Sequence, residues 1–159
     1  MKRTVISILI IFFLALADLG LLQYVGFWGK KPDFFISTLI FFTLFYKFSL
    51  SFPLIVFAGI LKDILSTSIL GLYTIVFSLA SILANHVSKL IMKENMWVNM
   101  LYTFSMTILI LSFLNILEFI FAGNIGHPAA IFTQFILPKG IINGLISPVW
   151  FKILSRISR

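Results

Sequence analysis

Cysteine is absent from this chain of 159 residues, and charged residues are scarce. Without thiols there can be no disulfide bonds, no thiolate metal sites and no lipid anchors attached through cysteine. Charged residues make up 11% of the sequence, whereas soluble domains carry about 25%. Because so few charges cannot cover the outside of a water-soluble fold, most of the surface must face lipid.

The sequence also has few candidates for catalysis or metal binding. Its two histidines, His86 and His127, belong to different segments, and no histidine or acidic pair has the spacing of metal ligands on one helix. Serines are numerous, but no motif places a base and an orienting group beside one of them. Phosphate-binding glycine motifs are missing as well. We therefore expect no enzyme activity, no metal and no cofactor.

Long apolar runs dominate what is present. Hydrophobic residues make up 60% of the chain, and the mean hydropathy is +1.11. The runs are continuous and lack the alternation of barrel strands, so helices are the expected membrane structure. We predict an all-α integral membrane protein, one domain built as a six-transmembrane-helix bundle, with spans at about 4–27, 34–47, 50–65, 70–91, 97–121 and 130–154.

Three of these runs have an alternative interpretation. The second and third runs are short for a bilayer crossing, which takes about 20 residues, and they could instead form one re-entrant hairpin. The first run also resembles a signal peptide around Ala15-Leu16-Ala17, but it continues past that point, so an uncleaved span is expected.

The basic residues predict the orientation of the bundle. The formal net charge is +7, and the charges stand singly or in pairs between apolar runs, as topology signals do and nucleic-acid sites do not. With six spans and a cytoplasmic N-terminus, the outside loops hold only Lys30 and Lys31. The cytoplasmic side holds the larger basic set: Lys2, Arg3, Lys47, Lys89, Lys93, Lys152, Arg156 and Arg159. We therefore expect a multi-pass membrane protein with both termini in the cytoplasm.

Polar residues within the runs form a candidate intramembrane site. Its members are Asp18, Asp63, Glu118, Lys139 and Asn143. Ionisable residues are costly in lipid unless they are paired, and all four ionisable members favour the outer half of the bundle. We expect Lys139 to pair with Asp18 or Asp63. The alternative is a structural role, with the charges reaching towards the membrane surface.

Small residues mark two helix-packing faces, because they let helices approach closely and form hydrogen bonds across the contact. On the fourth run, steps of 4, 3, 4 and 3 residues give the face Thr74, Ser78, Ser81, Asn85 and Ser88. On the last run, a GxxxG pattern gives the face Gly140, Gly144 and Ser147. The sequence leaves open whether either face meets this chain or another one.

The second run is rich in phenylalanine, and we expect it to be exposed as a candidate partner face. Its members are Phe34, Phe35, Phe41, Phe42 and Phe45. Large aromatic side chains provide extensive contact area with few polar demands, which suits a partner helix in lipid. The alternative is that these rings simply face lipid.

Several of these segments, taken together, resemble one bacterial family. Pro32-Asp33 opens the second run, Gly59 and Asp63 stand four residues apart in the third, and Gly71-Leu72-Tyr73 opens the fourth. A short basic tail follows Pro148 in the last run. In length, span order and the placement of these motifs, the sequence resembles the rod shape-determining protein MreD family.

The resemblance implies a non-catalytic subunit of the cell-wall elongation machinery. Such proteins associate with MreC, a single-span protein, and through it link MreB filaments to the wall-building glycosyltransferase and transpeptidase. The family is also similar in six-helix architecture to the substrate-binding subunits of energy-coupling-factor transporters. That similarity implies the alternative function, binding of a small solute in an outward-facing pocket.

Overall fold

The computed structural model describes residues 2–19, 32–66, 69–89, 95–123 and 128–157, and its regular elements are all helices. The first five are α1 (Lys2–Leu19), α2 (Phe34–Phe45), α3 (Phe48–Leu65), α4 (Leu72–Ser88) and α5 (Met96–Ala122). The last three follow one another without a break: α6 (Pro128–Ile131), the π-helix η2 (Phe132–Ile136) and α7 (Leu137–Ile157). The prediction of an all-α fold is confirmed for the described part of the chain.

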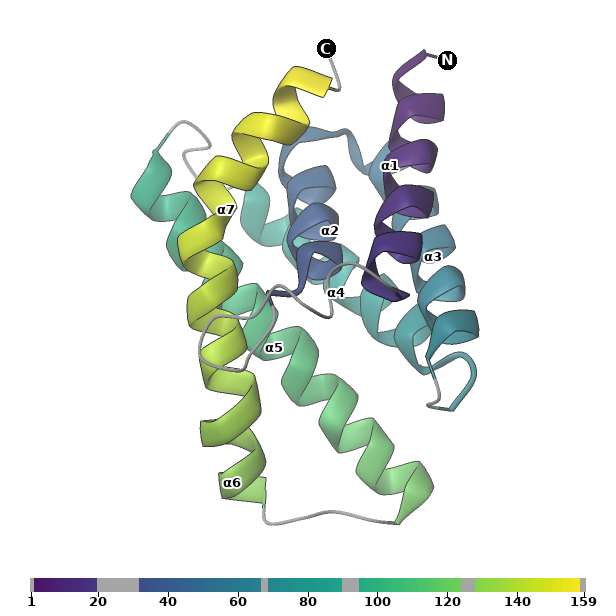
Figure 1. Cartoon of the computed structure of the whole chain (residues 1–159), viewed down its shortest axis with the longest axis vertical. Helices are drawn as coiled ribbons and strands as arrows, with labels where there is room; N and C mark the ends of the chain where they lie inside the picture. The colour runs from purple at the N-terminus through teal and green to yellow at the C-terminus, as the bar shows by residue number, and fades with distance from the viewer. Residues whose placement is uncertain (1, 20–31, 67–68, 90–94, 124–127, 158–159) are drawn as a thin grey trace.

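The helices form a bundle around α2 (Figure 1). α3 packs along α4, and α5 packs along α7. α2 lies between these pairs and contacts α1, α3, α4, α5 and α7. The described helices run alternately up and down, so the start of α1 and the end of α7 lie at the same end of the bundle.

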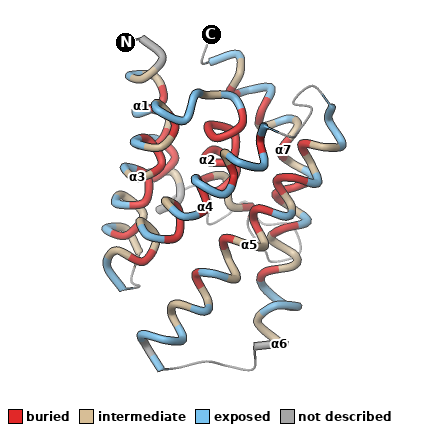
Figure 2. Tube along the Cα trace, turned by 180° about the vertical axis from the view of Figure 1, so that it is seen from behind, coloured by how far each residue is buried: buried red, intermediate tan, exposed pale blue. Residues whose placement is uncertain are grey.

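Burial of α2 overturns the expectation of an exposed aromatic face. Ten of its twelve residues are buried, and in Figure 2 the buried segments gather in α2 and on the faces turned towards it. Phe35, Phe41 and Phe42 lie in the core, Phe34 is half-buried, and Phe45 is the exposed member at the helix end. A helix that is apolar all round is a buried helix, because no side of it is better suited to the surface.

Helix lengths set which elements can cross a bilayer on their own. Phe48–Leu65 and Met96–Phe121 are long and apolar enough by length and composition, whereas Thr4–Ala17, Phe34–Phe45 and Leu72–Ser88 are shorter apolar helices. With twelve residues, α2 is about 18 Å long, well short of a hydrocarbon layer of about 30 Å. The part of the first predicted span beyond Leu19, and the loop that contains His127, lie outside the described residues.

Two prolines are accommodated within the last helical rod. Pro148 has no N–H to donate to the carbonyl of Gly144, and the Ser147 hydroxyl donates to that carbonyl instead, at 2.8 Å. Just before Pro138 the chain forms the π-helix, in which the N–H of Leu137 donates to the carbonyl of Phe132. Both devices keep backbone groups hydrogen-bonded where the ordinary helical pattern is interrupted.

Candidate functional site

The Asp63 carboxylate holds the start of the neighbouring helix. It lies near the end of α3 and is 4% exposed. One oxygen accepts from the backbone N–H of Tyr73 at 2.9 Å. The other accepts from the backbone N–H and the hydroxyl of Thr74, at 3.0 and 2.6 Å. The first N–H groups of a helix lack partners within it and carry partial positive charge, so α4 supplies the donors that a buried carboxylate needs.

Two glycines let the α3–α4 hairpin close around this carboxylate. Gly71 has a φ of +92°, a left-handed conformation that residues with a Cβ rarely adopt. A Cβ built on Gly59 would lie 2.7 Å from the Cα of Thr74, which leaves room only for hydrogen. Gly59, Asp63 and Gly71-Leu72-Tyr73 therefore act as one structural unit that joins α3 to the first turn of α4.

A second helix start is held in a similar way by Asn143. Its side-chain oxygen accepts from the backbone N–H of Asp33 at 2.8 Å, and its amide nitrogen lies 3.4 Å from the Thr107 hydroxyl. Asp33 in turn caps α2, because its carboxylate accepts from the N–H of Ile36 at 3.1 Å. Asn143 is fully buried, and it connects α7 to both α2 and α5.

Trp150 adds a second connection between α7 and α2. Its indole N–H donates to the Thr38 hydroxyl at 2.9 Å. Its ring centroid also lies 4.8 Å from that of Phe34. The first half of α2 is thus attached to α7 by hydrogen bonds at Asp33 and Thr38 and by the aromatic contact of Phe34 with Trp150.

The GxxxG face of α7 packs on α5 of the same chain. A Cβ on Gly140 would lie 2.9 Å from the side chain of Ile108, and a Cβ on Gly144 would lie 3.2 Å from the carbonyl of Met100 and from the Cβ of Phe104. The open question from the sequence is thereby answered for this face, because its partner is internal.

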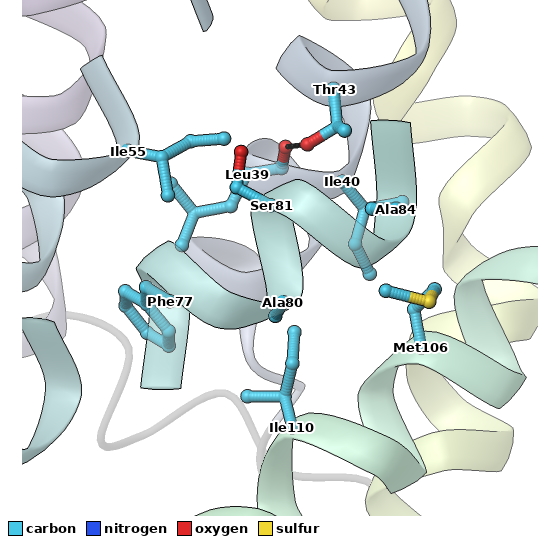
Figure 3. A pocket seen from close by; sticks show the side chains of 10 residues that line it. All are labelled: Leu39, Ile40, Thr43, Ile55, Phe77, Ala80, Ser81, Ala84, Met106 and Ile110. Carbon is cyan, nitrogen blue, oxygen red and sulfur yellow. Dashed lines mark hydrogen bonds between the residues drawn. The ribbon is translucent and has the colours of Figure 1, made fainter. Parts of the chain in front are cut away.

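The polar stripe of α4 does not have a single partner along its length. Thr74 bonds to Asp63, whereas the hydroxyls of Ser78 and Ser88 donate to carbonyls within their own helix, those of Thr74 and Asn85. The Ser81 hydroxyl is buried without a hydrogen-bond partner among the described residues. It lies beside a small cavity of about 10 Å³ among α2, α3, α4 and α5, which Thr43 also lines (Figure 3). That volume is about the size of one water molecule.

Comparison with known proteins identifies the family. Residues 1–157 match the family model described as rod shape-determining protein MreD. The chain belongs to the rod shape-determining protein MreD family. A search of curated proteins and a search of solved structures each found no match. As a member of the MreD family, the chain is a shape-determining membrane protein, and the resemblance drawn from its motifs is confirmed.

The polar residues expected to form one intramembrane site in this MreD-family chain lie in separate places. Asp63 belongs to the α3–α4 hairpin, and Asn143 belongs to the contact of α7 with α2 and α5. Lys139 and Glu118 are half-exposed on α7 and α5. The side chain of Asp18 lies outside the described residues, although its backbone is part of α1.

Lys139 and Asp63 do not pair in the structure, and the side chain of Asp18, the other expected partner of Lys139, lies outside the described residues. The structure describes the side chains of Lys139 and Asp63 and contains no ion pair between them, and both carboxylate oxygens of Asp63 are occupied by α4. Their similar depth in the predicted topology did not make their helices neighbours, because α7 packs on α2 and α5, whereas Asp63 faces α4. Lys62, the residue before Asp63, has its ammonium 5.4 Å from the ring centroid of Phe35.

Three residues that matter here were not among the predicted site residues: Asp33, Thr38 and Trp150. Asp33 carried a usable signal, since an aspartate directly before an apolar run is a typical helix N-cap. Thr38 and Trp150 carried none, because a hydrogen bond between residues 112 positions apart depends on which helices are neighbours.

Proposed function

We propose that this protein is a non-catalytic subunit of the bacterial cell-wall elongation machinery. In this role it scaffolds an MreC-like single-span protein and so links MreB filaments to the glycosyltransferase and transpeptidase of wall elongation. The observation that carries the proposal is the match to the MreD family over residues 1–157.

The hydrogen bonds made by the buried polar side chains support a scaffolding role. Asp63 and Asn143, the most deeply buried polar members of the candidate site, each fix the start of a helix. Their hydrogen-bonding capacity goes into positioning α4 and α2 against their neighbours. A bundle held in this way keeps its outer faces in fixed relative positions, which is what a protein that positions partners needs.

We further propose six spans in the cytoplasmic membrane, with both termini in the cytoplasm and an architecture like that of energy-coupling-factor substrate-binding subunits. The distribution of charge supports this orientation. Lys47, Lys89, Lys152 and Arg156 are exposed and belong to the ends of helices at the end of the bundle that holds both termini. Basic residues concentrate on the cytoplasmic side of membrane proteins.

The decisive experiment deletes the gene in a rod-shaped host and then expresses the intact chain in the deletion strain. Deletion is expected to give rounded cells, and expression of the intact chain is expected to restore rods. Purification of the tagged chain from native membranes should then recover a single-span protein with an extracytoplasmic domain. Intact cell shape after deletion, together with recovery of ATPase subunits and tight binding of a vitamin-like solute, would instead establish the transporter alternative.

A further inference from the structure

An open groove lies on the surface of the bundle where α5 and α7 meet. Its volume is about 260 Å³, and its lining is almost entirely apolar: Trp97, Met100, Leu101, Phe104, Ile141, Gly144 and Leu145. Gly144 forms part of the lining because it has no side chain there. The groove opens to the exterior of the bundle, where a membrane protein meets lipid.

The groove continues along α7 into a basic stripe. Leu145, Val149, Lys152 and Arg156 follow one another at steps of 4, 3 and 4 residues, so they share one face of the helix. All four are exposed. Lys152 lies seven residues beyond Leu145, a distance of about 10 Å along the helix axis. An apolar groove and a pair of cations therefore lie in line on one helix face.

The charges at this end of the bundle suit an anion. The basic residues described there are Lys47, Lys89, Lys152 and Arg156. The carboxylates whose side chains the structure describes, Asp33, Asp63 and Glu118, belong to the first turn of α2 and the last turns of α3 and α5, away from that end. Trp97 stands at the first turn of α5 and is 75% exposed, and tryptophan is the residue that membrane proteins place at the level of the lipid headgroups.

We propose that the groove between α5 and α7 binds an acyl chain of an anionic phospholipid, whose phosphate is held by Lys152 and Arg156. Arginine and lysine form charge-assisted hydrogen bonds with phosphate oxygens, and basic clusters attract anionic lipids. The basic residues in line with the groove favour an anionic lipid as its occupant. The inference goes beyond the scaffolding role and needs only a membrane location.

Native mass spectrometry of the purified full chain tests the headgroup part of this proposal. The protein is titrated with phosphatidylglycerol and, separately, with phosphatidylcholine of the same acyl chains. The double variant Lys152→Gln with Arg156→Gln is expected to bind phosphatidylglycerol about tenfold or more weakly and phosphatidylcholine nearly unchanged. The matched control is Lys47→Gln with Lys89→Gln, which removes the same charge from the same end of the bundle and is expected to bind both lipids as the unmodified chain does.

A groove-filling variant tests the acyl-chain part independently. Leu145 is 61% exposed, so Leu145→Trp adds volume to the groove without entering the core. It is expected to weaken binding of both lipids. The proposal is overturned if the control pair weakens phosphatidylglycerol as much as the test pair, because the effect would then be general surface charge. It is equally overturned if Leu145→Trp leaves lipid bound, or if that variant releases a co-purifying protein while lipid stays bound.

Discussion

The backbone N–H and the hydroxyl of Thr74 both donate to one carboxylate oxygen of Asp63. This arrangement places a charged group of one membrane helix at the positive end of the next, and the other oxygen is taken by Tyr73. Among the described residues, this carboxylate within an apolar bundle is therefore compensated by backbone N–H groups and one hydroxyl. The start of α4 and the end of α3 depend on the same few atoms.

Removing the Asp63 carboxylate should destabilise the protein strongly. Asp63→Ala leaves donors at the start of α4 buried without acceptors, at a cost of about 1–3 kcal/mol for each such group. Thermal unfolding in detergent, followed by circular dichroism, measures the loss. Glu118→Ala is the matched control, because Glu118 is half-exposed on α5, and it should unfold within a few degrees of the unmodified chain. Equal midpoints for the two variants would contradict the capping role.

Alanine at Gly59 should cost more than alanine at Gly140. The new Cβ at position 59 meets the backbone of Thr74 at 2.7 Å, whereas at position 140 it meets the flexible side chain of Ile108 at 2.9 Å. Overpacking costs about 1–3 kcal/mol, and we expect Gly59→Ala at the upper part of that range and Gly140→Ala at the lower part. The folded yield and unfolding midpoint of each variant give the order, and the reverse order would show that the α3–α4 contact tolerates a shift.

Substitution of Asn143 should loosen α2. Asn143→Leu has a similar volume but leaves the N–H of Asp33 without its acceptor, a loss of about 1–3 kcal/mol. Thr107→Val should cost much less alone, and it should add little to Asn143→Leu, because the Asn143–Thr107 contact is long at 3.4 Å. Unfolding midpoints of the single and double variants test this order. Equal losses from the two single variants would mean that Thr107, not Asp33, is the main partner.

Truncation of a core phenylalanine should impair folding, in contrast to truncation of a lipid-facing one. Phe42 is fully buried in α2, so Phe42→Ala should cost about 3–5 kcal/mol through lost contacts and a residual cavity. Phe121 is 67% exposed near the end of α5, and Phe121→Ala should leave the folded yield almost unchanged. Yield of monodisperse protein in detergent separates the two. Similar yields would indicate that α2 is not the centre of the bundle in the membrane.

The proposed orientation can be tested with reporter fusions. A fusion after Lys93 is expected to report the cytoplasm, because exposed basic residues gather at that end of the bundle, and a fusion after Gly126 is expected to report the outside. A cytoplasmic signal after Gly126 would contradict the six-span topology. A fusion after Tyr46 further distinguishes two complete spans from a re-entrant hairpin, since only two complete spans bring the connection between α2 and α3 to the cytoplasmic side.

The sequence predicted those features that depend on neighbours along the chain. Long apolar runs defined the helices, and the two glycines of the GxxxG pattern, Gly140 and Gly144, lie against α5 in the structure. The placement of α2 could not be predicted, because its residues are apolar on every side and periodicity then gives no direction. The partners of Asp63 could not be predicted either, nor could the separation of Lys139 from it. Depth in a membrane can be read from position in a span, but which helices stand side by side depends on the packing of the whole bundle.

The attachment of α2 to α7 also has a consequence for the order in which the chain can fold. Asp33 and Thr38 find their partners, Asn143 and Trp150, 110 and 112 residues later in the sequence. A ribosome adding about 5–20 residues each second takes roughly 5 to 20 seconds to cover that interval. Throughout that interval, α2 is present without α7, the helix that holds its first half. The central helix α2 is thus synthesised early, and its hydrogen bonds to α7 are among the last to form.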